Sequence, residues 1–250
     1  MKISFVIPAY NEEKYIADCL RAVQAEISRF GRERPDVVLE VVVVNNASTD
    51  RTRAIIQGFR NVRIVDEFRK GLVRARHAGF VATDGELVAN IDADTRVPPG
   101  WLSRVFAEFQ RNPQLVVLSG PYYYHDLSLP ARMLVTVFYF GGYMISQFNR
   151  MFGKGGLIQG GNFVIRRDAW SGVGGFDTSI EFYGEDTDVA RRLSQVGKVK
   201  WTWKLSMHTT ARRLKHEGVV RTGLTYALNF FSTMYGGKPV TQKYTDIRPK

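Results

Sequence analysis

The sequence predicts an α/β protein: a Rossmann-like, mostly parallel β-sheet with helices on both faces, followed by a helical extension at the C-terminus. Three observations lead to this prediction. In the first half of the chain, short apolar runs rich in β-branched residues alternate with segments of helical periodicity. Connections of this kind join parallel strands. Polar residues follow several of the apolar runs, as expected where strands end at one edge of a sheet.

The apolar runs predict five strands in the first half. The run VVLEVVVV is dense in valine, which is typical of a parallel strand buried on both faces. The predicted strands cover residues 3–7, 37–44, 62–66, 86–91 and 115–120.

The intervening segments predict helices. Residues 12–29 carry apolar side chains at helical spacing, and Ser48, Thr49 and Asp50 offer N-caps for a helix through Gln57. Two further helices are predicted within residues 71–84 and, started by a pair of prolines, at 101–110.

The second half of the chain is less regular. It predicts a flexible loop at 153–161, a strand at 162–167, a helix at 185–197 and an edge strand at 198–204. Residues 211–237 are basic and then apolar, which is typical of a helix on a membrane surface.

Residues 133–149 carry no charge and lie between two arginines. A membrane span needs about 20 apolar residues. This segment is shorter and contains Gly-Gly, Thr, Ser and Gln. Three interpretations stay open from the sequence: a span, an interfacial helix or a buried helix.

Composition narrows the class of protein. Hydrophobic residues make up 44% of the 250-residue chain, which excludes global disorder. The net charge of +11 suits nucleic acid, anionic lipid or a phosphorylated substrate, but no nucleic-acid-binding signature is present, so we expect no nucleic-acid partner. The single cysteine, Cys19, excludes an internal disulfide framework and fits a reducing compartment. The N-terminus does not read as a signal peptide, so we expect a cytoplasmic protein, peripheral at most on the inner face of the cell membrane.

Two acids follow the fourth predicted strand directly. Asp92 and Asp94, separated by Ala93, could bind one hard cation such as Mg²⁺ or Mn²⁺ together with substrate phosphates. The alternative is structural, because Asp94 could cap the turn before the two prolines.

A set of motifs resembles a known family. The ordered segments are IPAYNEE, VVVVNNASTDRT, GLVRARHAG, IDADT, GGNFVIRRDAW, GGFDTSIEFYGEDTDVARRL and MHTTARR. They resemble family 2 of the inverting glycosyltransferases, which have the A-type nucleotide-sugar fold. The resemblance runs from residue 3 to about residue 213.

The resemblance implies a role for each matching residue. Nucleotide or donor contacts fall on Pro8, Ala9, Tyr10, Glu12, Asn46, Ser48, Asp50, Arg76, Asp92, Ala93, Asp94, Gly160, Gly161, Asn162, Arg212 and Arg213. His77 stands beside Arg76 where Asn is more usual in the family. The metal ligands would be Asp92, Asp94 and His208. Asp186 would be the catalytic base, supported by Glu185, although acids at a helix start also suit the helix dipole.

The resemblance also implies an overall organisation. A glycosyltransferase domain would cover 1–213, with a nucleotide-binding half (1–120) and an acceptor-binding half (121–213). Residues 214–250 lie beyond the resemblance, and their basic and apolar composition predicts a helical extension that could associate with a membrane. The donor would be a nucleotide sugar, with UDP favoured over GDP or dTDP. The motifs do not identify the acceptor. The net charge, the uncharged segment 133–149 and the basic C-terminal segment suggest a glycan, a lipid-linked sugar or a polyprenyl phosphate reached at an anionic membrane. A homo-oligomer is compatible with the pattern.

Three other functions compete with this one. A nucleotide-sugar-binding protein without catalysis would share the fold, but the acids at positions 92, 94 and 186 argue against it. A nucleotidyltransferase usually opens with a Gly-rich phosphate loop, which does not follow the first predicted strand. A nucleic-acid binder is suggested by the charge alone.

Overall fold

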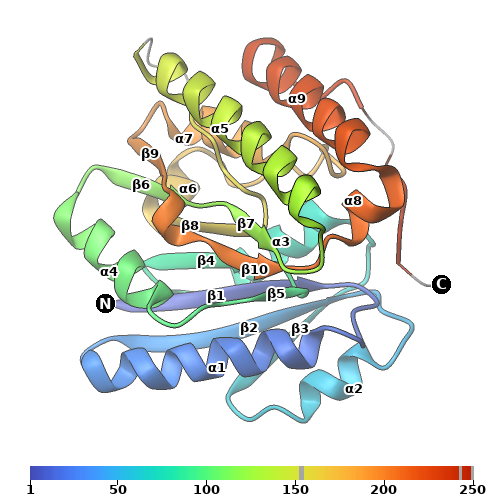
Figure 1. Cartoon of the computed structure of the whole chain (residues 1–250). Helices are drawn as coiled ribbons and strands as arrows, with labels where there is room; N and C mark the ends of the chain where they lie inside the picture. The colour runs from blue at the N-terminus through green and yellow to red at the C-terminus, as the bar shows by residue number, and fades with distance from the viewer. Residues whose placement is uncertain (152–154, 242–243, 249–250) are drawn as a thin grey trace.

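The computed structural model describes residues 1–151, 155–241 and 244–248. A seven-stranded sheet forms its centre (Figure 1). In chain order its strands are β1 (Lys2–Ala9), β2 (Val38–Asn46), β3 (Val62–Glu67), β4 (Leu87–Ile91), β6 (Leu115–Ser119), β8 (Asn162–Arg166) and β9 (Lys198–Trp201). A three-stranded sheet is formed by β5 (Thr95–Arg96), β10 (Met207–Thr209) and β7 (Tyr122–Tyr124).

The large sheet has the order β3-β2-β1-β4-β8-β6-β9. Every neighbouring pair is parallel except the two that involve β8, which runs antiparallel to β4 and to β6. The prediction of a mostly parallel sheet is therefore confirmed, and β9 lies at the predicted edge. A strand from the second half of the chain thus separates two strands of the first half.

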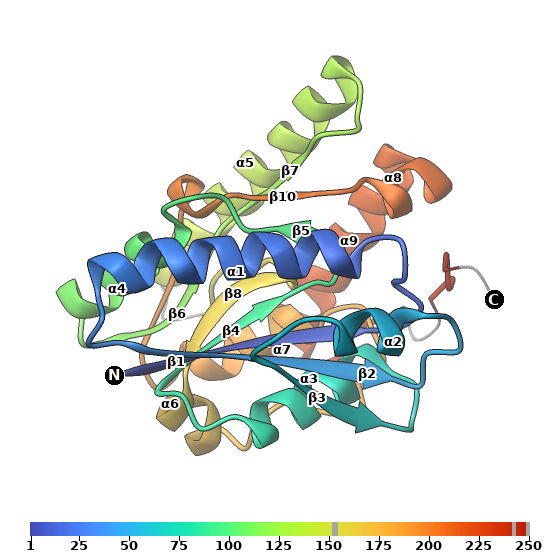
Figure 2. The ribbon, with the colours of Figure 1, turned by 90° about the horizontal axis from the view of Figure 1, so that it is seen from below.

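Helices cover both faces of this sheet, as predicted (Figure 2). One face packs against α1 (Ile16–Glu33), α2 (Thr52–Gln57) and α4 (Trp101–Arg111). The other packs against α3 (Leu72–Ala82), α6 (Arg167–Gly172) and α7 (Glu185–Leu193). The side chains of β1 alternate between these two cores, with Phe5 and Ile7 on the α1 side and Val6 on the α3 side.

Two predicted helices begin later than expected. The helix predicted from residue 12 begins at Ile16, because the preceding residues bind the loop after β2: the backbone N–H of Glu13 donates to the carboxylate of Asp50 at 3.1 Å. The helix predicted from residues 48–50 begins at Thr52. Asp50 stands before it and accepts from the backbone N–H of Thr52 at 2.9 Å.

The predicted segment 211–237 is divided. It forms α8 (Arg212–Glu217) and α9 (Val219–Gly236), which are separated by Gly218 at φ +86°. Glycine adopts this left-handed backbone at little cost, so the chain turns there. The predicted loop 153–161 begins outside the described residues.

The uncharged segment 133–149 lies within a longer helix, α5 (Leu129–Met151). One side of α5 packs on the aromatic cluster of β9 and the short 3₁₀ helix η1 (Trp203–Leu205), where the ring of Tyr143 lies 5.6 Å from that of Trp201. Its opposite side is exposed. The buried interpretation therefore holds for one side of α5, and the interfacial interpretation stays a prediction for its exposed side. Neither α5 nor any other helix of the described chain is long and apolar enough to cross a bilayer.

Candidate functional site

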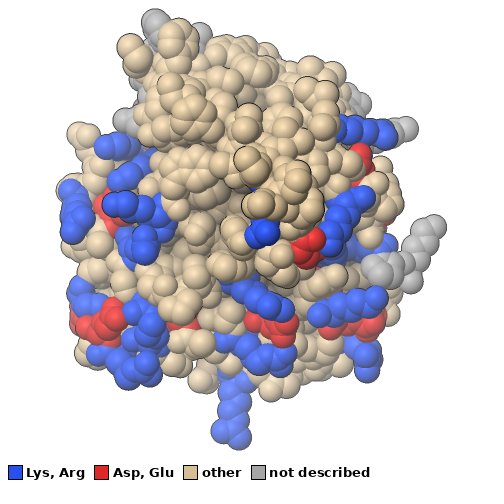
Figure 3. Space-filling view, in the orientation of Figure 1, with Lys and Arg blue, Asp and Glu red and all other residues tan. Residues whose placement is uncertain are grey.

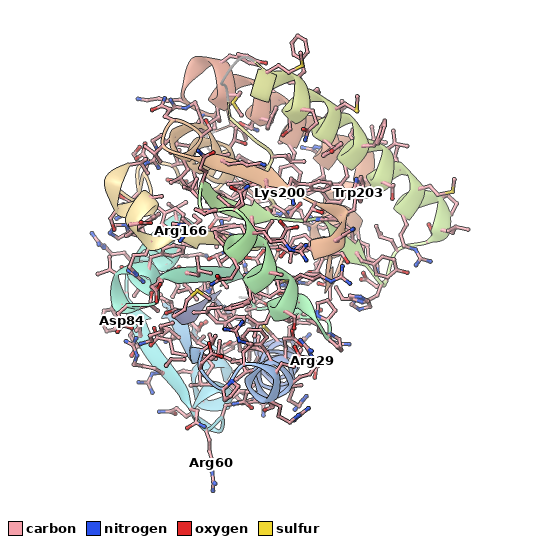
Figure 4. All side chains as sticks on the ribbon, turned by 90° about the vertical axis from the view of Figure 1, so that its left-hand side faces the viewer. Arg29, Arg60, Asp84, Arg166, Lys200 and Trp203 are labelled. Atoms are coloured by element: carbon pink, nitrogen blue, oxygen red, sulfur yellow. The ribbon has the colours of Figure 1, made fainter. Side chains whose placement is uncertain are left out.

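The strand ends of the sheet border a cavity of about 490 Å³ beneath α5, α8 and α9 (Figure 1). Most of the residues expected at the site line it: Pro8, Glu12, Arg76, Asp92, Ala93, Asp94, Gly160, Gly161, Glu185, Asp186, Arg212 and Arg213. A second hollow of about 670 Å³ lies beside Arg166 of β8 and Lys198 of β9 (Figure 4 labels Arg166). None of the expected site residues lines it.

Asp92 follows β4 and lies in the tight turn to β5. Its backbone carbonyl accepts from the backbone N–H and the hydroxyl of Thr95, at 3.1 and 2.7 Å. One carboxylate oxygen accepts from Arg76 at 3.1 Å and the other from the hydroxyl of Tyr122 at 2.9 Å. Burial, and then the nearby charge of Asp92, raises the pKa of Tyr122 well above its usual range, so this hydroxyl stays protonated and donates.

Asp94 lies at the end of the same turn and faces a cationic partner. Its carboxylate accepts from Arg212 at 2.6 Å and from the hydroxyl of Thr210 at 3.2 Å. Arg212 also donates to the buried Glu12 at 2.9 Å, and Arg248 donates to the same Glu12 oxygen at 2.9 Å. Burial and the charge of Asp94 together raise the pKa of Glu12. Two arginines thus balance two acids at this end of the cavity.

A second acidic group comes from the start of α7, where Gly184 turns the chain at φ +80°. Glu185 is buried and forms an ion pair with Arg76. Asp186 faces the cavity and accepts from the backbone N–H of Thr187 at 2.8 Å. Asp186 is half-buried, and the desolvation of its carboxyl raises its pKa, although Arg76 acts in the opposite direction.

The fully buried Arg76 connects the two acidic groups. It contacts Asp92 on one side and Glu185 on the other. Because α3 carries Arg76, the packing of this helix on β1 fixes the spacing between the turn after β4 and the start of α7.

Several expected residues do not line the cavity. Asn46 donates to the carbonyls of residues 67 and 69 and accepts from the N–H of Gly71, which fixes the loop before α3. Ser48 and Asp50 bind the loop after β1, at Asn11 and Glu13. These side chains therefore hold the loops after β1 and before α3 in place without lining the cavity themselves.

Tyr10 lies at the edge of the same rim and Ala9 is buried beside it. The ammonium of Lys70 lies 4.0 Å from the Tyr10 ring centre, and the guanidinium of Arg248 lies 5.8 Å from it. The C-terminal residues therefore lie next to the expected nucleotide-binding loop.

Asn162 has a structural environment. It is completely buried and its amide donates to the backbone carbonyls of Gly120 and Leu205, at 3.0 and 2.6 Å. Its oxygen accepts from the indole of Trp101 at 3.3 Å.

Two histidines lie away from the cavity. His208 is exposed on β10, and its ring lies 5.2 Å from that of Tyr123. The expectation that it joins Asp92 and Asp94 as a third ligand is not met by this arrangement, because neighbouring residues of a strand point to opposite faces and it is Thr209 that lines the cavity. His77, on α3, lies against Trp170, with 5.8 Å between the ring centres, and does not line the cavity.

The sequence analysis missed three contributors. Tyr122 binds Asp92, Thr210 binds Asp94 and Arg248 binds Glu12. Tyr122 could have been found, since it follows the fifth predicted strand at the same edge of the sheet as the acids. Arg248 could not, because its distance along the chain from Glu12 leaves no local signal.

The far part of the cavity is apolar. Its walls come from the inner sides of α5 and α9 and from the loop before α7. The apolar lining residues include Val135, Phe138, Ile145, Leu157, Phe182, Leu214, Val219, Ala227 and Phe230. The cavity therefore joins a charged end at the strand termini to an apolar end under the two helices.

Solved structures with the same arrangement define the class of fold. A mannosyltransferase from Pyrobaculum calidifontis, in complex with GDP-Man and Mn²⁺, matches with a TM-score of 0.66 at 19% identity, over 88% of this chain and 62% of that one. Glucosyl-3-phosphoglycerate synthase from Mycobacterium tuberculosis, in complex with Mn²⁺, UDP and glucosyl-3-phosphoglycerate, matches with a TM-score of 0.62 at 20% identity, over 96% of this chain and 81% of that one. The expected A-type nucleotide-sugar fold is confirmed.

The family follows from the sequence match. Residues 4–174 match the model of glycosyl transferase family 2, and the chain belongs to this family.

Curated relatives match over shorter stretches. A dolichyl-phosphate beta-glucosyltransferase, ALG5C, of Trichomonas vaginalis is 34% identical over 36% of this chain and 28% of its own length. An undecaprenyl-phosphate 4-deoxy-4-formamido-L-arabinose transferase of Pseudomonas aeruginosa is 33% identical over 41% and 31%. The matches thus span about a third of these relatives.

Proposed function

We propose that the chain transfers a single sugar, with inversion, from a nucleotide-diphosphate sugar to a lipid-linked acceptor. The observation that carries this proposal is the cavity itself. It joins the acids after β4, an arginine-rich end and a separate carboxyl at the start of α7, and it continues into an apolar part. Membership of family 2 supports the reaction class.

Asp92 and Asp94 fit a divalent cation. Both are carboxylates that line one cavity, and Mg²⁺ or Mn²⁺ prefers oxygen ligands. Within the described ranges, no group of three or more His, Cys, Asp or Glu side chains is placed to bind a metal, so the remaining ligands would come from a diphosphate and water. A cation bound there would stabilise the negative charge of the leaving diphosphate. Arg212 and Arg213 line the same end and suit bidentate contacts with phosphate oxygens.

Asp186 is the residue we assign as base. Inverting transfer is one displacement at the anomeric carbon: the acceptor oxygen forms the new bond, the bond to the diphosphate breaks, and a carboxylate takes the acceptor proton if one is present. The raised pKa of Asp186 strengthens it as a base. Glu185, held by Arg76, would position the start of α7 instead of reacting.

The apolar part of the cavity supports a lipid-linked acceptor. An acceptor with a hydrocarbon chain would place this chain between the inner sides of α5 and α9 and its head group near Asp186. The printed names of two relatives concern dolichyl phosphate and undecaprenyl phosphate, which have the same chemical character. A polyprenyl phosphate is therefore the acceptor class that we favour.

Calorimetric titration tests the donor site. UDP, GDP, dTDP and CDP would each be added with Mn²⁺ and with EDTA. We expect one of these nucleotides to bind only in the presence of the metal, and UDP is the one we favour. The variant Asp94→Asn should lose the metal dependence, whereas Asp168→Asn, an exposed acid on α6, should bind like the wild type. If the folded protein binds none of the four, the donor assignment is wrong. If it binds one but Asp186→Asn still turns over, the base lies elsewhere.

A further inference from the structure

The outer side of α5 carries a continuous row of exposed apolar residues. Spaced three or four residues apart, they form one stripe along the helix: Leu129, Met133, Val137, Phe140, Met144, Phe148 and Met151. In Figure 4, α5 lies along the upper edge of the molecule with side chains directed outwards, while Trp203 lies on its inner side. The seven side chains are between 52% and 80% exposed.

A second stripe runs along α9. Its exposed apolar residues are Val220, Leu224, Leu228, Phe231 and Tyr235, again three or four residues apart. Together with Tyr226, the two helices carry thirteen of the twenty large hydrophobic side chains that are exposed among the described residues. Scattered single residues are normal on a protein surface, but this concentration marks an interaction surface.

The two helices form one surface. They lie side by side at Phe138 and Gly223, where a Cβ on the glycine would approach the phenylalanine ring to 2.7 Å, and again where the hydroxyl of Tyr235 donates to Asn149 at 2.7 Å. Both contacts advance along the helices in the same direction, so the stripes run together. We call the exposed residues of these stripes the α5–α9 face; two of them, Val137 and Phe231, also line the cavity.

The charged residues within the two helices are all basic, whereas the acids next to their starts, Asp126 and Glu217, are paired with Lys215 and Arg213. Neither helix contains an acidic residue in its sequence. Arg132 stands beside Met133 at the start of one stripe and Arg221 beside Val220 at the start of the other, and neither forms an ion pair with a described residue within 4.0 Å. Figure 3 shows that the upper part of this view, over α5 and α9, is almost free of charged groups, whereas both signs gather over the lower part. An apolar surface with basic residues at its border is complementary to an anionic bilayer.

We propose that the α5–α9 face docks on an anionic lipid bilayer, with both helices lying in the interface. The inner sides of the same helices line the apolar part of the catalytic cavity, so docking would bring that part of the cavity next to the acyl region. This inference rests on the proposed function for its purpose: a lipid acceptor would enter between the helices without its hydrocarbon chain crossing water. The orientation would leave the charged end of the cavity facing the aqueous side, from which a nucleotide sugar arrives.

Flotation with vesicles tests the docking. The purified protein would be mixed with vesicles of phosphatidylcholine and phosphatidylglycerol, and with vesicles of phosphatidylcholine alone. We expect the protein to float with the anionic vesicles. The double variant Phe140→Glu/Leu224→Glu should partition at least about tenfold more weakly, because both substitutions place a charge on the docked face. Neither residue lines the catalytic cavity.

A matched control separates position from charge. Val81→Glu/Val196→Glu also converts two exposed apolar residues, 63% and 54% exposed against 57% and 60% for Phe140 and Leu224, but on α3 and in the loop after α7. It should float like the wild type. A second pair tests the basic border: Arg132→Gln/Arg221→Gln should weaken binding to anionic vesicles, whereas Arg60→Gln/Arg111→Gln, with the same change of net charge, should not. Arg60 lies at the opposite end of the molecule from α5 (Figure 4).

The outcomes for docking and for catalysis are distinguishable. The proposal is overturned if the wild type ignores anionic vesicles, or if both glutamate double variants float equally. It is also overturned if Phe140→Glu/Leu224→Glu converts a dimer to a monomer and the wild type does not float, since the face would then bind a second copy. Nucleotide titration of the same variants reports the proposed function separately. Flotation without any nucleotide binding would leave the docking supported and the transferase assignment wrong.

Discussion

The buried ion pairs of Arg76 give the sharpest prediction about what maintains the site. The side chain of Arg76 is 1% exposed, that of Glu185 is 5% exposed and that of Asp92 is 31% exposed. Replacing Arg76 by Met keeps an unbranched apolar stem and removes the guanidinium with its charge. Glu185 then stays buried without a cationic partner, which is the case in which breaking a buried pair costs about 3–5 kcal/mol. Asp92 is partly solvated, so the loss of its contact with Arg76 adds less to this cost in free energy.

The expected loss is measurable by thermal unfolding. For a chain of this size, 1 kcal/mol corresponds to about 2–4 °C, so Arg76→Met should lower the Tm by roughly 6–20 °C. The second substitution Glu185→Gln should restore part of this loss, because it removes the buried charge that the first one left unpaired. Arg60→Met, on the surface, should change the stability by no more than about 0.5 kcal/mol.

Two results would refute this reasoning. If Arg76→Met costs less than about 1 kcal/mol, Glu185 is not a buried charge that depends on Arg76. If Glu185→Gln worsens the loss instead of relieving it, the carboxylate contributes through other contacts.

Three further predictions concern the same region. Gly161→Ala should abolish metal-dependent nucleotide binding in calorimetry, because its Cβ would lie 2.0 Å from a carboxylate oxygen of Asp92, whereas Gly31→Ala, with nothing within 4 Å, should bind normally. Asp186 has a raised pKa in the folded state, so its ionisation costs folding stability as the pH rises through that pKa. Asp186→Asn should therefore raise the Tm at neutral pH. The gain in Tm should vanish at a pH low enough to protonate this aspartate in the unfolded chain as well. Burial raises the pKa of the Cys19 thiol, so a thiol reagent at neutral pH should label it only after unfolding, and rapid labelling of the native protein would contradict its burial.

The strands could be predicted well because each is a compact apolar run. The valine-rich strand, predicted at 37–44, is β2 at Val38–Asn46. Helix starts were less accurate. Asn11 and Glu13 prefer hydrogen bonds with the loop after β2 over the first turn of α1, and such long-range contacts leave no periodic signal.

The site was predictable in its acids and less so in its other parts. Asp92 and Asp94 could be placed because they follow a strand, and Asp186 because of the family motif. His208 lies exposed on β10, so its role as a ligand stays a prediction, because a motif does not determine which face of a strand a residue occupies. The antiparallel insertion of β8 was equally hidden, since a strand of apolar residues has the same pattern in either direction.

The position of β8 has a consequence for how the chain folds during synthesis. Residues 162–166 lie between β4 and β6, and the amide of Asn162 binds carbonyls at positions 120 and 205 on both sides. When only the first 120 residues have left the ribosome, β4 and β6 have no common neighbour and each keeps an open edge. The sheet of residues 1–120 therefore becomes continuous only when the strand after Gly161 is inserted, and the turn that carries Asp92 acquires its final neighbours in the same event.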